Sequence, residues 1–311
     1  MRNRVPAVAL IAALVLGLTL LAAPTAAASN TAASNTAAKV AARSSGKVTT
    51  LAATLKGANE VPDPGDPDGR GRAVVRLAGD QACFLLQWSG IGAPTASHIH
   101  SGRAGVAGPV VVPFFQPGVN AASLPDTLSS VAGCVEVDPA VAARIAARPA
   151  SWYVNIHTAD FPAGAIRGQL HRVRHLDLDL PHQLAARLTG ANEVPGPGDP
   201  DGRGLALVRT GRERVCFALA WTGIAPPIFA HIHAGPAGVA GPVVVLFFDV
   251  PELPGAPTAA LPSTIAAAGG CVDGQDPALL RDIRRHPASY YANIHNLDFV
   301  PGAIRGQLHR I

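Results

Sequence analysis

The sequence predicts an all-β fold of two tandem β-sandwich or barrel domains, each with one short helix. Three observations support this prediction: the 311-residue chain repeats itself, its apolar residues fall in short runs, and 32 glycines and 28 prolines accompany only 15% charged residues. A chain of this length holds two domains of ordinary size. A high content of turn residues favours strands joined by turns over long helices.

The duplication involves four segments that occur twice in the same order. LKGANEVPDPGDPDGRG at residues 55–71 returns as LTGANEVPGPGDPDGRG at residues 188–204, and YVNIHTADFPAGAIRGQLHR returns as YANIHNLDFVPGAIRGQLHR. The CFLLQWSGI and AGVAGPVVVPFF segments also have close copies. The repeat predicts one domain over residues 48–175 and a second over residues 181–311.

Within each copy the pattern is mostly that of strands. CFLLQWSGI, GPVVVPFF, SWYVNIH and AIRGQLHRV are apolar or alternating runs bounded by Gly, Pro, Asn and Asp. The exceptions are DPAVAARIAARPA at residues 138–150 and DPALLRDIRRHPA at residues 276–288. Each begins with Asp-Pro, an N-cap followed by proline at the first helical position, and stops at a second proline, which predicts a helix of about two to three turns.

The first 28 residues have the form of a secretory signal peptide. Arg2 and Arg4 precede an apolar run of about 15 residues, shorter than the roughly 20 that span a bilayer, and three alanines follow. We expect cleavage after Ala28, a secreted extracellular protein, and no membrane span in the mature chain; an uncleaved anchor is the alternative. Residues 29–47, which contain SNTAA twice, predict a flexible linker.

The charge pattern argues against a nucleic-acid partner. Loss of residues 1–28 removes two arginines and no acid, so the mature chain has 23 basic and 21 acidic side chains. The arginines are scattered along the sequence, without a basic run or interleaved aromatic residues. We therefore expect the partner to be an extracellular protein or a component of the cell envelope.

The four cysteines fall two to each copy: Cys83 and Cys134, then Cys216 and Cys271. In an exported protein, an even count divided equally between repeats predicts one disulfide inside each domain. A thiolate metal site is the alternative, and the lack of any CxxC spacing disfavours it.

Polar side chains recur at matched positions of both copies. In ASHIH, His98 and His100 are two residues apart and therefore share one strand face, with Ile99 on the other. SWYVNIH and AIRGQLH alternate in the same way, so three neighbouring strands would assemble one polar binding patch beside the glutamate of NEVP. The predicted patch consists of Glu60, His98, His100, Asn155, His157, Arg167 and Gln169 in the first copy and Glu193, His231, His233, Asn293, His295, Arg305 and Gln307 in the second.

The histidines of this patch also suit a metal site. Two imidazoles on one face can chelate an ion, and a third can complete a triad for copper or zinc, to which Glu60 or Glu193 could add a carboxylate. The candidate ligands are His98, His100, His157, His231, His233 and His295. The alternative is a hydrogen-bonded patch that orders loops and needs no ion.

Neither copy contains a recognisable catalytic motif. There is no nucleophile elbow, HExxH helix, P-loop or dinucleotide fingerprint, so we assign no catalytic residue. DPDGRG at residues 66–71 and 199–204 matches a calcium loop only in part, because no glutamate follows at the twelfth position. Asp-Gly between strands favours a hairpin turn there.

The ordered set LKGANEVP, ASHIH with its Gly-rich tail, AGPVVV and YVNIHTADFPAGAIRGQL resembles the chordin-type or CHRD domain, and it occurs twice. The resemblance covers nearly all of residues 50–172 and 184–310 and is that of a secreted microbial protein with tandem CHRD domains. It implies an immunoglobulin-like fold related to copper-zinc superoxide dismutases. The family's usual GEIRGQ reads GAIRGQ here, with Ala165 and Ala303 in place of the glutamate.

The resemblance implies two functions. The first is a non-catalytic binding or structural module of the extracellular space or cell envelope. The second is a metal-binding protein with dismutase-like redox activity through the HxH and NIH histidines. A dismutase site needs more histidines and a bridging arrangement with an aspartate, and neither copy has a second HxH-like cluster. The first function is therefore the leading expectation.

Overall fold

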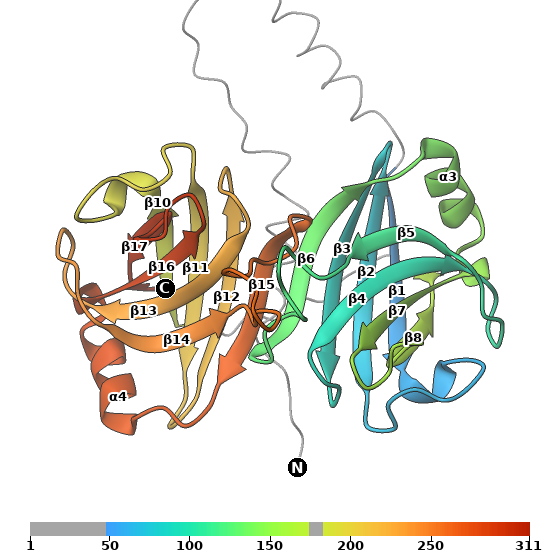
Figure 1. Ribbon diagram of the computed structural model, residues 1–311, viewed down its shortest axis with the longest axis horizontal. Helices are drawn as coiled ribbons and strands as arrows, with labels where there is room; N and C mark the ends of the chain where they lie inside the picture. The colour runs from blue at the N-terminus through green and yellow to red at the C-terminus, as the bar shows by residue number, and fades with distance from the viewer. Residues whose placement is uncertain (1–47, 174–182) are drawn as a thin grey trace, which may run out of the picture.

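The computed structural model describes residues 48–173 and 183–311, so the predicted signal peptide and linker lie outside the described residues. The two copies form two β-rich units side by side, with one α-helix at each far end, α3 (Pro139–Ala147) and α4 (Pro277–Arg285) (Figure 1). The predicted all-β class with short helices is confirmed.

The first copy is an antiparallel β-sandwich. Its pairings give one layer in the order β6–β3–β2–β1 and a second in the order β5–β4–β7–β8, with β8 and β9 also paired to β1. The elements are β1 (Thr49–Lys56), the 3-10 helix η2 (Gly57–Asn59), β2 (Arg70–Ala78), β3 (Gln81–Ser89), β4 (Pro94–Ser101), β5 (Val110–Phe115), β6 (Leu128–Glu136), η3 (Pro149–Ser151), β7 (Trp152–Thr158), β8 (Ile166–Gln169) and β9 (His171–Arg172).

The second copy repeats this order. Its layers are β15–β12–β11–β10 and β14–β13–β16–β17. The elements are β10 (Leu184–Thr189), η4 (Gly190–Asn192), β11 (Arg203–Thr210), β12 (Val215–Thr222), β13 (Pro227–Ala234), β14 (Val243–Asp249), β15 (Ile265–Val272), η5 (Pro287–Ser289), β16 (Tyr290–Asn296), β17 (Ile304–Gln307) and β18 (His309–Arg310).

Both helices begin as the Asp-Pro pattern predicts. The Asp138 carboxylate accepts hydrogen bonds from the backbone N–H groups of Ala140 and Val141, and Asp276 accepts one from Ala278. Such caps stabilise a helix by about 1 kcal/mol. Across the residues described, no helix has the length and apolar character needed to cross a membrane.

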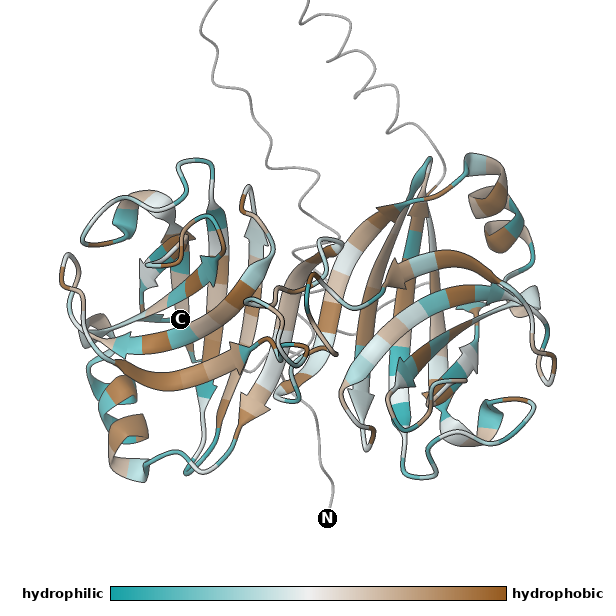
Figure 2. Ribbon diagram, in the orientation of Figure 1, coloured by the Kyte–Doolittle hydropathy of each residue, from teal (hydrophilic) through white to brown (hydrophobic). Residues whose placement is uncertain are grey.

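The core of each sandwich is filled by alternate residues of both layers. In β3, Phe84 and Leu86 face inward, and Phe84 stacks on Phe114 of β5 with ring centroids 4.7 Å apart. Phe217 and Phe247 form the same pair in the second copy, at 4.6 Å. Brown, hydrophobic stretches run along the strands, interrupted by white and teal positions, and teal is frequent in the loops (Figure 2). Each buried aromatic side chain contributes roughly 2 to 3 kcal/mol, so the alternation determines which face packs.

One disulfide lies inside each copy, as predicted. Cys83 of β3 stands opposite Cys134 of β6, and Cys216 of β12 stands opposite Cys271 of β15. Each bond closes a loop of 51 or 55 residues, which corresponds to about 4 kcal/mol in the chain-entropy model. The bonds fasten β6 and β15 to their own domains.

These two strands also join the domains, because β6 pairs antiparallel with β15. Where a residue of β6 pairs with a residue of β15, the counterparts of these two residues in the opposite copies also pair with each other. The two strands are therefore related by a local twofold pseudosymmetry. The central pairs are Val131 with Ala268, Ser130 with Gly269 and Ala132 with Ala267. The layers that contain β6 and β15 therefore form one continuous sheet, and neither strand is left as an open edge.

The outer face of this joined sheet carries a second apolar cluster that spans both domains. It consists of Val74, Leu85, Ala132, Ala185, Leu207, Cys216, Ala218, Ala220 and Ala267. Their burial adds apolar contacts to the backbone hydrogen bonds between β6 and β15, so the two domains associate through more than the strand pairing alone.

Two glycines permit the close approach of β6 and β15. A Cβ atom on Gly133 would overlap the backbone oxygen of Thr264, and one on Gly270 would overlap that of Thr127. We predict that Gly133→Ala with Gly270→Ala opens the pairing at a cost of about 1 to 3 kcal/mol per site. The radius of gyration from small-angle X-ray scattering should rise while circular dichroism stays unchanged.

The matched control is Gly196→Ala, because a Cβ at that position meets no atom of the described residues within 4 Å. An unchanged scattering profile for the double variant would contradict the prediction.

Candidate functional site

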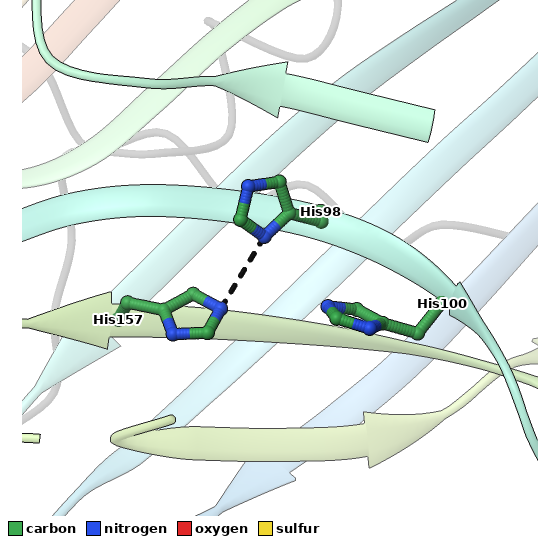
Figure 3. Close-up of side chains that lie close together, drawn as sticks. All are labelled: His98, His100 and His157. Carbon is green, nitrogen blue, oxygen red and sulfur yellow. Dashed lines mark hydrogen bonds between the residues drawn. The ribbon is translucent and has the colours of Figure 1, made fainter. Parts of the chain in front are cut away.

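Three histidines from two paired strands converge in each domain. β4 and β7 are antiparallel neighbours, and so are β13 and β16. One ring nitrogen from each member lies within 4.8 Å of those of the other two. Figure 3 shows the rings of the first cluster turned toward one another. The clusters are His98, His100 and His157, and His231, His233 and His295.

Backbone carbonyls orient two rings of the first cluster. The Nδ1 atom of His100 lies 2.9 Å from the oxygen of Gly108, and that of His157 lies 3.0 Å from the oxygen of Pro162. A carbonyl only accepts, so both Nδ1 atoms donate and both Nε2 atoms keep a free lone pair. Within the described part of the chain, His100 Nε2 has no hydrogen-bond partner, and His157 Nε2 lies 3.3 Å from Nδ1 of His98.

The second cluster repeats the two carbonyl bonds, but among its described residues no ring nitrogen is paired with another as His98 and His157 are. His233 Nδ1 donates to Gly241 and His295 Nδ1 donates to Val300, each over 2.8 Å. Among the described residues, no hydrogen-bond partner meets Nδ1 of His231, Nε2 of His233 or Nε2 of His295, and all three atoms are buried. Each ring of this cluster therefore holds one buried nitrogen without a partner.

Burial keeps these imidazoles neutral. Desolvation, followed by the neighbouring histidines, lowers the pKa of His98 to about 4 and that of His231 to about 3. Desolvation is also the largest cause that lowers the pKa of His295 to about 4. Neutral imidazole is the form that binds metal ions. Both ligand clusters found in the described residues consist of histidine alone, so Glu60 and Glu193 do not belong to them.

An aromatic and a cationic side chain stack behind each cluster. The ring of Tyr153 lies parallel to that of His100, with centroids 4.8 Å apart, and the guanidinium carbon of Arg167 lies 3.3 Å from the centre of Tyr153. Tyr291 stacks with its histidine and arginine in the same way. The predicted patch omits both tyrosines, although the alternation of SWYVNIH already placed Tyr153 on the polar face.

The predicted arginine and glutamine hold the Gly-rich loop at residues 102–109 over the site. Arg167 donates to the backbone oxygens of Arg103 and Val106, over 3.1 and 2.8 Å, and Gln169 donates to that of Gly102 over 2.6 Å. Arg305 and Gln307 make the equivalent bonds to Pro236, Val239 and Gly235. The structure thus assembles the predicted patch but closes much of it.

The exposed fractions make this closure clear. Arg167 and Asn155 are each 2% exposed, as are Arg305 and Asn293. His98 and His100 are each 8% exposed. These side chains therefore act on the protein's own loop and on each other, and a macromolecular partner would meet the loop first.

Glu60 and Glu193 lie beside the buried arginines. Glu60 is 7% exposed and packs against Gly164, where a Cβ would overlap its carboxylate. Burial raises the pKa of Glu60 to about 7, opposed by the charge of Arg167 and a hydrogen bond from Asn155. Burial likewise raises the pKa of Glu193 to about 7, opposed by the charge of Arg305. Glu60 thus supplies a carboxyl near the arginine, although Ala165 replaces the usual glutamate.

The two clusters differ in one neighbour. The ring of Phe229 in β13 lies 4.9 Å from that of His231 and 4.4 Å from that of His295. The corresponding residue of β4 is Ala96. His295 is accordingly buried, whereas His157 keeps an intermediate exposure. The second cluster has an apolar cover on the side where the first is more open.

The buried arginine should contribute strongly to stability. Arg167→Met keeps the apolar stem but removes two charged hydrogen bonds and leaves the polar atoms around it unpaired. We expect a loss of about 2 to 4 kcal/mol in the free energy of unfolding, measured by urea titration. Hydrogen exchange should accelerate at residues 102–109. The exposed side chain of Arg103 provides the control, because Arg103→Met should change stability by about 0.5 kcal/mol or less.

The raised pKa of the glutamates predicts a pH dependence. The folded protein holds the Glu60 proton more tightly than the unfolded chain, so stability falls as pH rises from about 4.5 to about 7. Glu60→Gln with Glu193→Gln removes this contribution, and the variant should gain stability relative to the wild type across that window. Urea midpoints measured at both ends test this, with the exposed Glu136→Gln as control. If the stability of the double variant and that of the wild type changed with pH in parallel, the prediction would be contradicted.

Comparison with known proteins gives one family. The model of the CHRD domain matches residues 51–170 and 184–308, one region in each copy. A search of curated proteins found no match. The two matched regions together cover most of the chain and contain both histidine clusters and both buried arginines. The chain belongs to the CHRD domain family, with two tandem copies of the domain.

Proposed function

We propose that this protein is a non-catalytic binding module of the extracellular space, and that each domain binds one copper or zinc ion through three histidines. The observation that carries the proposal is the convergence of one ring nitrogen from each of three histidines in both domains. Among the described residues, buried ring nitrogens lack a hydrogen-bond partner in all three histidines of the second cluster and in His100 of the first. A buried polar atom left unpaired costs about 1 to 3 kcal/mol, and one ion would satisfy several at once.

The donor set favours these ions. Imidazole suits copper and zinc, whereas calcium and magnesium prefer oxygen ligands. The Nδ1 atoms of His100 and His157 donate to backbone carbonyls. In metal sites, such a bond fixes the orientation of the imidazole ring and leaves Nε2 to bind the metal. A bound ion would supply a Lewis-acidic centre with a coordination position open to an exogenous ligand.

We do not extend the proposal to dismutase-like redox activity. Each cluster in the described residues has three histidines, without a fourth histidine or a carboxylate ligand. Such a cluster supports binding of an ion but lacks the larger, bridged ligand set of the dismutases.

The extracellular assignment rests on two features. The paired cysteines form two disulfides, which are typical of oxidising compartments, and the N-terminal 28 residues have the pattern of a signal peptide. The partner would be an extracellular protein or a cell-envelope component. Val106 and Val239, 40% and 47% exposed on the Gly-rich loops, are suitable first contacts for it.

Metal content tests the proposal. Chain purified without a His tag, stripped with chelator, reconstituted with zinc or copper and desalted should hold about two ions by mass spectrometry. His98→Ala with His157→Ala should remove one ion, and His231→Ala with His295→Ala should remove the other. Both double variants should remain folded, because none of these substitutions removes the buried arginine or the tyrosine stack.

The control is His171→Ala with His309→Ala, which changes two exposed histidines outside the clusters and should leave the metal content unaltered. A wild-type content below about 0.2 ions per domain would refute the proposal, as would equal losses in the control.

A further inference from the structure

The second domain contains a groove of about 410 Å³ between β11 and α4. Three arginines line it, Arg212, Arg281 and Arg284, together with Gln183, Thr210 and Gly211. Among the described residues that line it, none is an aspartate or a glutamate. We call this feature the arginine groove; it shares no residue with the histidine clusters.

One of the three arginines is fixed in place. Arg284 donates to the hydroxyl of Thr210 and to the backbone oxygen of Gly211, each over 3.0 Å. Thr210 is 4% exposed, and its hydroxyl donates to the side-chain oxygen of Gln183 over 3.2 Å. A guanidinium has five N–H donors, so these two bonds leave others for a ligand. The network holds a positive charge at the groove before any ligand arrives.

Two nearby carboxylates are engaged elsewhere. Asp273 forms a two-bond pair with Arg214. Asp282 of α4 accepts hydrogen bonds from His286 and from the hydroxyl of Tyr290. Helical spacing places residues 281 and 284 on one face of α4 and residue 282 on another. In the described residues, neither acid is therefore hydrogen-bonded to an arginine that lines the groove.

The first domain has the same strand and helix but none of the three arginines. The corresponding residues are Gly79, Ala143 and Ala146. Leu77 replaces Thr210, so the network that positions Arg284 is also missing. The first domain folds without these side chains, which indicates that the fold does not require them in the second.

We infer that the arginine groove binds a tetrahedral oxyanion, phosphate or sulfate, either free or carried on an extracellular polysaccharide. Guanidinium groups recognise such oxygens with paired, charge-assisted hydrogen bonds. Three of them line the groove, one after the end of β11 and two from α4. A tetrahedral ion has an oxygen for each, whereas a carboxylate offers only two oxygens. The groove's volume also accommodates an attached sugar.

Calorimetric titration of the full chain tests this inference with three probes: inorganic phosphate, inorganic sulfate and a sulfated dextran oligosaccharide, with unsulfated dextran as the blank. Arg281→Ala with Arg284→Ala gives the second domain the residues of the first and should weaken binding about tenfold or more. Because Arg284 also bonds to Thr210 and Gly211, Arg281→Ala alone, at an exposed residue, provides a second variant and should weaken binding at least about threefold.

The matched control is Arg144→Ala with Arg148→Ala, which removes the same charge at the helix of the first domain and should leave affinity unchanged. Binding of an inorganic ion identifies a free anion as the ligand, and binding of the sulfated oligosaccharide alone identifies the polysaccharide. No binding of any probe would overturn the inference, and so would equal weakening in the control. None of these outcomes depends on metal binding.

Discussion

The buried arginine near the end of each domain is the interaction on which the site depends. A guanidinium taken out of water costs several kcal/mol unless its surroundings compensate. Arg167 is compensated by two backbone oxygens of the Gly-rich loop, by the face of Tyr153 and by the charge of Glu60. Because Tyr153 stacks in turn on His100, the same arginine that closes the loop also orients a candidate metal ligand.

The joined sheet and the histidine clusters use different layers of the sandwich. Domain association involves β6 and β15, whereas the histidines come from β4, β7, β13 and β16 of the other layers. Each disulfide fastens a joining strand to its own domain. The domains can therefore associate tightly while both clusters keep their local geometry, and the fold delivers two similar sites in one chain.

The sequence patterns predicted those features of the structure that depend on residues close together in the chain. Alternation placed His98 and His100 on one face, and Asp-Pro located the start of both helices. The convergence of His157, 59 positions away from His98, depends on a strand pairing that no local pattern specifies. The strand pattern predicts that these polar side chains share a face, but it does not predict how exposed that face is. Arg167 donates two hydrogen bonds to the loop, which is the kind of contact that the alternative of a loop-ordering patch describes. Which loop is held, and how far it covers the site, depends on the fold.

A comparison of the two domains shows which side chains they have in common and which differ. Both retain the histidines, the stacked tyrosine and the buried arginine, and both keep the carbonyl bonds that orient the rings. They differ at Ala96 and Phe229 beside the clusters and at the arginine groove. A property that both domains have in common therefore resides in the shared set. The groove, assembled from Arg212 and from Arg281 and Arg284 more than 60 residues later in the sequence, belongs to the second domain alone.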